Sequence, residues 1–364
     1  MGTKGWASVK IGFVSCCIVS FESFTYTTQE NQTIKAMSLQ IPESPAAPGG
    51  AYHSRPAEYT QAVEKALALF KEHLAADESS WELLPEKEEV KLAKKATSDD
   101  AYDIPLVKGV TTVEGATPAQ VLATIQLPGL RKKWDPRFAE GHAIARYSPN
   151  SYEFYSLMNS PSYFIWQRDI VGVQENFYQG DDIVVIQTSV QDEDNLPDAG
   201  SYAKSRTRAT VDVSGWKIAK KGNDTELTYV VKVHLNGSIP TSIVSTIANE
   251  TPLCTARVRD VHYTVGYHPY ELHTANGGKT DSKTVNVTQT FTDDKGEKKW
   301  SSVYTGVGSD NFEIQYDGKR MYSGGVAVDV SGAGASEVKT TVDEGSHIVA
   351  VQVGDGAKDK EFTM

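Results

Sequence analysis

The order of the apolar patterns constrains this fold more than any other feature of the chain. Strand-like runs follow one another between residues 143 and 235, and a long stretch with helical spacing, Ile239–Val265, comes after them. An α/β fold would instead alternate strands with helices. The order therefore predicts an α+β fold in which a curved antiparallel sheet and a long C-terminal helix enclose a cavity.

The expected strands are separated by turn residues, and their apolar residues alternate along the chain. They are residues 143–147, 151–158, 163–176, 182–190, 205–213 and 225–235. Within the final helix, Pro252 is expected to produce a kink, because proline removes a backbone donor and its ring clashes with the preceding turn.

The segment before these strands is predicted to begin with an amphipathic helix. Ser54 is expected to cap it, with Pro56 in its first turn and its end near Ala76. We then expect an edge strand at Trp81–Lys95 and a second strand at Pro105–Glu114. A short helix capped by Thr117 is expected at Pro118–Ile125.

The C-terminal part returns to strand patterns after a polar stretch. Residues 283–355 are expected to form a small all-β module of about six strands, for which a sandwich is one arrangement. Asp317-Gly318 lies between two apolar runs and predicts a hairpin turn. Valines 326, 328 and 330 are expected to form a further strand.

The first fifty residues lack the pattern of a packed domain. Lys4 and Lys10 precede a short apolar stretch, Ile11–Phe21, which is similar to a secretory signal peptide. A disordered extension or a misassigned start is the alternative, and Pro42–Gly50 is typical of a linker. The predicted organisation is an N-terminal extension, an α+β domain, a linker and an all-β module with a polar tail: residues 1–50, 51–270, 271–282 and 283–364.

Composition excludes several classes of function. The net charge of −11 disfavours nucleic-acid binding. No apolar run is long enough for a standard transmembrane helix. The three cysteines offer no metal or redox spacing and suit a reducing compartment, so we expect a cytoplasmic protein, or a secreted one if residues 1–36 are a signal peptide. The histidines form no metal motif, and no nucleotide or nucleophile motif occurs; we expect no catalytic residues, metal or cofactor.

Five short motifs resemble, in order, those of the START family, the steroidogenic-acute-regulatory-related lipid-transfer domains. They fall between about Trp81 and Tyr267. The matching pieces are Arg131-Lys-Lys-Trp134-Asp135, Gln167-Arg168-Asp169, Arg208 followed by Gly215-Trp216, Leu227-Thr228-Tyr229, and Leu235-Asn236-Gly237-Ser238-Ile239-Pro240. The bulk of Trp134 and Trp216 favours a role in the core for both.

The resemblance implies that residues 51–270 form a lipid-binding domain with the helix-grip fold of the Bet v 1-like superfamily. It implies a tunnel that holds one lipid, such as a sterol, a phospholipid or a ceramide. It also implies a gate formed by Ile239–Val265 and the loop Gln191–Gly200. Where the sterol-transfer members carry an acid and an arginine, this chain has Ser156 and Gln174, both neutral. The residues expected to line or gate the tunnel are Tyr155, Ser156, Arg168, Gln174, Leu196, Ile243, Val244 and Ile247.

Three hypotheses for the function remain open. The first is non-enzymatic binding or transfer of a lipid, with transient contact to a membrane surface. The second is a cyclase or hydrolase that acts on a hydrophobic substrate in the same cavity. It would need an inward-facing ionisable pair, for which His142 and His234 are the candidates. The third is a lipid-gated adaptor whose C-terminal β module binds a protein partner.

Overall fold

The computed structural model describes residues 51–364 except residues 128, 161, 163–164, 192–205, 238 and 295. Every described residue belongs to one compact unit of the chain. Among the described residues, no helix is both long and apolar enough to span a membrane.

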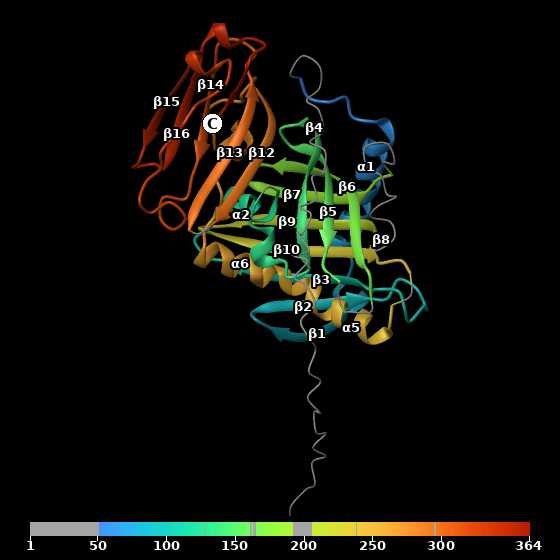
Figure 1. Cartoon of the computed structure of the whole chain (residues 1–364). Coiled ribbons are helices and arrows are strands. Elements are labelled where there is room, and N and C mark those ends of the chain that lie inside the picture. Colours follow the sequence, from blue (N-terminus) through green and yellow to red (C-terminus); the bar gives the residue numbers. More distant parts are fainter. Residues whose placement is uncertain are drawn as a thin grey trace, which may run out of the picture. The chain divides into compact units, whose positions relative to one another are not determined.

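A sheet of ten strands dominates the described part of the chain (Figure 1). Its order is β1-β2-β3-β10-β9-β7-β6-β5-β4, and all these neighbours are antiparallel, whereas the short β8 pairs in parallel with β6. The strands are β1 Glu82–Lys87, β2 Val90–Lys95, β3 Leu106–Val113, β4 Phe138–Ser148, β5 Ser151–Met158, β6 Gln167–Gln179, β7 Asp182–Ser189, β8 Arg206–Arg208, β9 Thr210–Lys221 and β10 Asp224–His234.

Helices cover both faces of this sheet. They are α1 Ala57–Ala75, α2 Pro118–Ile125, α3 Arg131–Trp134, α5 Thr241–Glu250 and α6 Cys254–Thr264. Because neighbouring strand residues point to opposite faces, Val184 and Ile186 of β7 pack with α1, whereas Val185 packs with α2 and α6. The face that carries Val185 is called the inner face below. The predicted α+β helix-grip fold is confirmed.

The predicted kink in the C-terminal helix is also confirmed. A 3-10 turn, Thr251–Leu253, separates α5 from α6 and contains Pro252. Strand β3 passes close beneath it: a Cβ atom at Gly109 would lie 2.3 Å from the carbonyl oxygen of Pro252. A glycine at this position therefore lets the broken helix pack tightly against the sheet.

The strands after α6 form two further sheets, which we call the C-terminal β module. They are β11 Tyr270–Leu272, β12 Val285–Asp294, β13 Glu297–Thr305, β14 Asp310–Gln315, β15 Val338–Asp343, β16 Ile348–Val353 and β17 Glu361–Thr363. One sheet has the order β11-β14-β16-β15 and the other β12-β13-β17. Tyr304 of the second sheet and Phe312 of the first belong to one core, which is the packing of a sandwich.

Several local predictions are wrong, and each error has a local cause. Pro56, not Ser54, occupies the position before α1, and no side chain caps that helix. The single strand expected at residues 81–95 is the β1–β2 hairpin, because Glu88 and Glu89 both adopt positive φ and turn the chain.

The hairpin expected at Asp317-Gly318 does not form. The Asp317 carboxylate accepts hydrogen bonds from the backbone N–H groups of Lys319 and Arg320, both 3.1 Å, and these close a turn. Strand β14 pairs instead with β11 and β16. The valines at 326, 328 and 330 pack against the core of the module without joining a strand.

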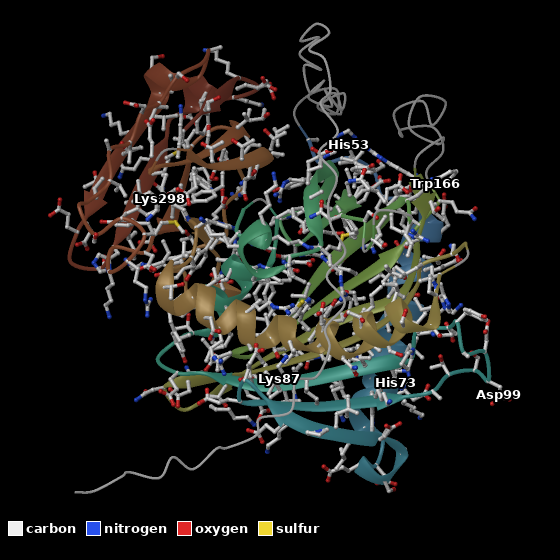
Figure 2. All side chains as sticks on the ribbon, turned by 60° about the horizontal axis from the view of Figure 1, so that its bottom comes forward. His53, His73, Lys87, Asp99, Trp166 and Lys298 are labelled. Carbon is white, nitrogen blue, oxygen red and sulfur yellow. The ribbon has the colours of Figure 1, made fainter. Side chains whose placement is uncertain are left out.

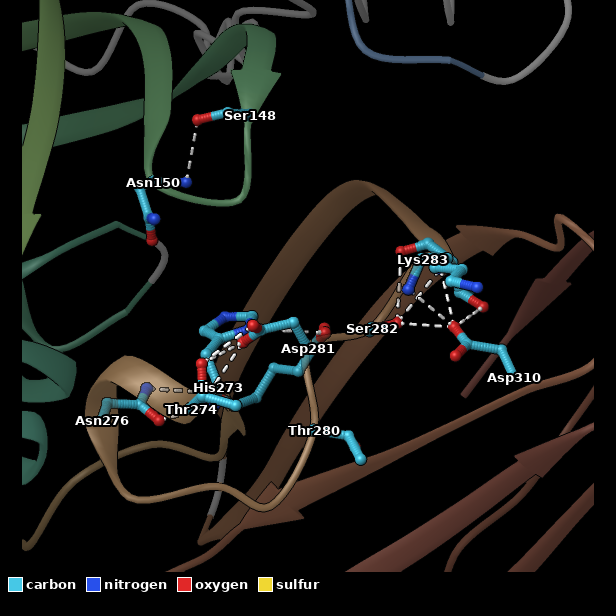
Figure 3. A network of polar contacts seen from close by, with 12 residues as sticks. Ser148, Asn150, His273, Thr274, Asn276, Thr280, Asp281, Ser282, Lys283 and Asp310 are labelled. Carbon is cyan, nitrogen blue, oxygen red and sulfur yellow. Dashed lines mark hydrogen bonds and ion pairs between the residues drawn. The ribbon is translucent and has the colours of Figure 1, made fainter.

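Aspartates hold the connection between β11 and β12 in place (Figure 3). The Asp281 carboxylate accepts from both the backbone N–H and the hydroxyl of Thr274. One oxygen of Asp310 accepts from the backbone N–H groups of Lys283 and Thr284 and from the hydroxyls of Ser282 and Thr284, at 2.8–3.0 Å. Burial opposes ionisation of Asp310, but these hydrogen bonds outweigh it and hold its pKa below the usual range.

Replacing Asp310 by Asn should therefore make the protein less stable at neutral pH. We expect a loss of about 1 kcal/mol, because the carboxylate is only partly buried and its charged hydrogen bonds weaken. A depressed pKa stabilises the fold above the unfolded-state pKa, and that stabilisation disappears as the pH falls through the folded-state pKa. The difference between wild type and variant in urea unfolding should thus shrink below about pH 4. A pH-independent difference would contradict this account.

Candidate functional site

A cavity of about 120 Å³ lies on the inner face of the sheet, beneath the broken C-terminal helix. Its walls are mainly apolar and aromatic. The main contributors are Trp134, Phe154, Met158, Ile170, Trp216 and Val231. Trp216 stacks on Tyr229 at 3.8 Å between ring centroids and meets Trp134 edge-to-face at 5.8 Å. These rings form one rigid wall of the cavity.

A chain of neutral hydrogen bonds crosses the sheet along this face. Ser214 Oγ donates to Gln187 Oε1 at 3.1 Å, and Gln187 Nε2 donates to Gln174 Oε1 at 2.7 Å. Tyr229 Oη lies 3.2 Å from Ser214 Oγ and acts as the donor, since the single serine hydrogen is already used. Tyr152 Oη also donates to Gln174 Oε1, at 2.7 Å. We call these five residues the polar ladder.

The polar ladder is neutral because burial disfavours charge on its phenols. Burial raises the pKa of Tyr152 to about 12 and raises the pKa of Tyr229 further still. The ladder continues through Asn176, which accepts from Gln174 and donates to Gln126. Three of its members, Gln187, Ser214 and Tyr229, line the cavity, so it offers polar contacts without a fixed charge.

Arginine side chains line another part of the cavity wall. Arg131 pairs with Asp135 at 3.2 Å and stacks over Phe138. Arg168 is only 4% exposed, and it donates to the backbone carbonyls of Trp166, Leu235 and Asn236. Carbonyl groups rather than a carboxylate thus satisfy Arg168, which ties the ends of β6 and β10 together.

Hydrogen bonds join the end of α5 to the loop before β4. Arg137 donates to Glu250 and to the hydroxyl of Thr251, both at 2.9 Å. Arg137 and Thr251 line the cavity, so this pair closes one side of it. The apolar cluster Ile104, Ile165, Ile239, Val244 and Ile247 holds the rest of α5 in place.

The structure brings some of the predicted site residues together and separates others. Arg168 and Ile247 line the cavity. Ser156 and Gln174 are fully buried on the inner face, where Ser156 lies 3.5 Å from Arg131 and Gln174 belongs to the polar ladder. Neither of these two contributes to the cavity wall.

The remaining predicted site residues lie elsewhere. Val244 and Ile243 pack in the cluster beside the cavity, on the same helix as Ile247. Tyr155 neighbours Phe154 on β5, so it points to the opposite face, where it bonds to Arg206. Leu196 and most of the expected gate loop lie outside the described residues.

Sequence reasoning missed several residues of the cavity wall, including Arg137, Gln187, Ser214, Tyr229, Cys254 and Arg257. A signal for two of them was present in the sequence. Gln187 and Ser214 are polar residues within otherwise apolar strands, and both pair across the sheet in line with Gln174. A polar residue at a buried strand position indicates a hydrogen-bond partner nearby, because buried polar groups are nearly always hydrogen-bonded.

Neither of the two histidines considered as catalytic candidates reaches the cavity wall. No histidine lines it among the described residues. His142 packs against Tyr155, and His234 bonds to Asp212 and Asp103 away from the cavity. Burial raises the pKa of the Cys254 thiol to about 12, so it is protonated and a poor nucleophile. The described residues also contain no cluster of three metal-ligating side chains.

Comparison with solved structures finds similar chains at low sequence identity. Human STARD10 is 18% identical, with 60% of this chain and 84% of that chain covered and a TM-score of 0.47. Human StAR-related lipid transfer protein 5 is 19% identical, with 55% and 96% covered and a TM-score of 0.48. The lipid transfer and protein localization domain of human StarD13 is also 19% identical, with 54% and 95% covered and a TM-score of 0.42.

Sequence comparisons decide the family. No curated protein matches this chain. The family model for the START domain matches residues 61–258, more than half of the chain. This match spans the sheet from β1 to β10, most of α1 and the first turn of α6, and thus nearly every element that surrounds the cavity. The chain belongs to the START domain family.

Proposed function

We propose that this protein binds a lipid in the cavity beneath α5 and α6 and transfers it between membranes without catalysing a reaction. The observation that carries the proposal is an apolar, aromatic-walled cavity to which the neutral polar ladder contributes Gln187, Ser214 and Tyr229. Apolar walls favour an acyl chain or ring system, at roughly 0.8 kcal/mol per buried CH₂. The ladder supplies partners for a neutral or zwitterionic head group.

The cavity must enlarge to accept such a ligand. Its volume of about 120 Å³ is small beside the roughly 300–1,000 Å³ of ordinary ligand pockets. We therefore assign the structure to the closed state. Opening would separate α5 from the sheet at the apolar cluster that contains Ile104 and Ile247. It would also break the hydrogen bonds of Arg137 to Glu250 and Thr251. This is the gating role that we propose for Ile243, Val244 and Ile247.

Trp166 is the proposed contact with the membrane surface. Its side chain, labelled in Figure 2, is 57% exposed. Its carbonyl oxygen accepts a hydrogen bond from Arg168, which lines the cavity. Tryptophan favours the boundary between water and lipid, because its ring is apolar and its N–H can remain hydrated. A transient contact here would bring the cavity close to the lipid.

Trp166→Ala should slow lipid transfer without abolishing lipid binding. We expect transfer from vesicles to fall about five- to ten-fold, which corresponds to about 1 kcal/mol or slightly more in the encounter with the membrane. Native mass spectrometry should show the same co-purifying lipid in wild type and variant. Leu83→Ala is the matched control, since Leu83 is 60% exposed on the edge strand β1. If wild type carries no lipid and takes none up from vesicles, the proposed function is wrong.

An enzyme is the less favoured alternative, because neither candidate histidine reaches the cavity. For the compartment we propose the cytoplasm, from the small number of cysteines. We assign residues 51–270 as the lipid-binding domain and residues 283–364 as an additional module, whose first sheet also includes β11 at the junction of that domain with the linker. A protein partner of that module is a further hypothesis.

A further inference from the structure

Strand β13 of the C-terminal β module has a neighbour on only one edge along about half of its length. Strand β12 pairs with it throughout. On the other edge, β17 pairs only with residues 303–305, and Met364 exchanges backbone hydrogen bonds of 3.0 Å with Ser302. Within the described part of the chain, no strand pairs with residues 297–301 on this second edge. The backbone groups that point to it have no ladder partner there.

A second extended segment, residues 326–330, also has a free edge. Ser331 exchanges backbone hydrogen bonds of 2.8 and 2.9 Å with Thr363 of β17, so the residues before it lie beside the line of that strand. The valines at 326, 328 and 330 are half-buried, whereas the two residues between them are exposed, which is the alternation of a strand. Among the described residues, none forms a backbone hydrogen bond with this segment.

These two free edges face each other across a gap that is one strand wide. Val303 pairs with Thr363, and Thr363 pairs in turn with Ser331. Adjacent strands lie about 4.8 Å apart, so edges that continue from these pairs are about 10 Å apart. A cavity of about 390 Å³ lies between them, with residues 297–300 on one side and residues 325–329 on the other. We call this cavity the strand slot.

Other residues of the module frame the strand slot. Met364 lines the end next to β17. Near the opposite end Lys298, labelled in Figure 2, donates to the carbonyl oxygen of Met321 at 3.3 Å and joins the two sides. The face toward the other sheet is apolar, and it consists of Ile314, Tyr316 and Val349. An added strand would thus enter a frame that already exists.

The ladder pattern determines which backbone groups point into the strand slot. In an antiparallel pair, the N–H and C=O of one residue point to the same edge, and residues two apart share that edge. Ser302 and Ser331 both bond toward the line of β17, from opposite sides. The residues that therefore direct their backbone N–H and C=O groups into the slot are Lys298 and Trp300 on one side and Ala327 and Asp329 on the other.

We propose that the strand slot binds an extended segment of another protein, which inserts as an additional strand between β13 and residues 326–330. Backbone hydrogen bonds to both sides supply affinity, and alternate side chains supply specificity. The segment must carry apolar residues at alternate positions, because its inward-facing side chains lie between Trp300 and Val328 and above the apolar face of the slot. The proposal gives the adaptor hypothesis a physical site and does not depend on the proposed lipid transfer.

Exposed charges at the rim define the polar positions of the partner segment. Continuing the pairing of Thr363 with Ser331 places the first outward-facing position of the slot opposite Asp329. Continuing the pairing of Thr363 with Val303 places the next outward-facing position opposite Lys299. Opposite charges on paired strands attract, so the slot favours a basic residue at the first position and an acidic residue at the next. The expected pattern is basic, apolar, acidic, apolar.

The test follows the fluorescence anisotropy of a labelled peptide, acetyl-Lys-Val-Glu-Val-Thr, as the full chain is added. We expect saturable binding with a dissociation constant of about 10–100 μM. A peptide with the order Lys-Glu-Val-Val-Thr can turn only one valine inward and should bind about ten-fold more weakly. Methylation of the second and third backbone nitrogens removes one donor to each side of the slot, and it should also weaken binding about ten-fold.

Matched variants locate the binding. Ala327→Pro removes an N–H that points into the slot and should weaken binding about ten-fold, whereas Ala327→Ser keeps this donor and should bind like wild type. Lys299→Glu combined with Asp329→Lys should reverse the charge preference, so that the peptide Glu-Val-Lys-Val-Thr binds better. If Ala327→Pro does not fold, the peptide controls and the charge reversal still decide the outcome.

Three results would overturn the proposal: no saturable binding of the first peptide, equal binding of its methylated form, or unchanged binding by a folded Ala327→Pro variant. A dimer of this chain that the peptide dissociates would assign the slot to a second copy and overturn the separate partner. Lipid uptake from vesicles is measured on the same preparation. Peptide binding without lipid uptake would support the slot and count against lipid transfer, whereas lipid uptake without peptide binding would overturn the slot alone.

Discussion

Replacing Ile247 by Trp should abolish lipid uptake while leaving the protein folded. Ile247 is 5% exposed, belongs to α5 and lines the cavity of about 120 Å³. An indole at this position would occupy the space that the lipid needs and would add a large apolar contact across the proposed opening. Overpacking of this kind costs about 1–3 kcal/mol of stability, which a domain of ordinary stability survives.

The measurement is uptake of a fluorescent lipid from vesicles, together with denaturant unfolding. Ser245→Trp provides the control, because Ser245 is exposed on the same helix and a Trp there adds bulk outside the cavity. We expect uptake at background level in the first variant and at the wild-type level in the second. Normal uptake by a folded Ile247→Trp variant would show that the lipid lies elsewhere.

The order of elements was predictable from sequence because apolar periodicity survives in most of this chain. The strand expected at 151–158 is β5, and Pro252 breaks the last helix as predicted. The resemblance to the START family could be seen from short motifs because their residues build the fold. Trp134 and Trp216 were expected in the core, and they pack against each other there. Their second role, as part of the cavity wall, required the structure.

The polar ladder could not be predicted in the same way. Gln174, Gln187 and Ser214 lie far apart in sequence, and only the register of three neighbouring strands aligns them. That register depends on tight turns, such as the one at Gly180, which has φ of +64°. A shift of one residue would turn Gln187 to the outer face and leave Gln174 with Tyr152 but without its second donor.

Turns whose geometry depends on a hydrogen bond with a side chain also could not be predicted from the sequence pattern. Asp317-Gly318 has the composition of a hairpin turn, but the Asp317 carboxylate caps the following backbone N–H groups. Asp317 is only 2% exposed because it packs beside Gly266 at the end of α6. A contact with a distant segment thus overrides the local preference.

Trp216→Ala should produce the largest loss of stability of the substitutions considered. Trp216 is 2% exposed, packs with Trp134 and Tyr229, and belongs to the core that joins the sheet to α2 and α6. Removal of a buried indole typically costs about 3–5 kcal/mol. Urea unfolding should show this loss, whereas Trp166→Ala should change stability by less than about 0.5 kcal/mol, because Trp166 is exposed.

The same substitution separates stability from function. Because Trp216 lines the cavity, its removal enlarges the space that Ile247→Trp fills. Where the Trp216→Ala variant stays folded, we therefore expect it to take up lipid. It should also accept bulkier lipids than wild type does. A folded Trp216→Ala variant that takes up no lipid would mean that the aromatic wall itself recognises the ligand. A loss of stability below about 1 kcal/mol would mean that this wall collapses without forming a void.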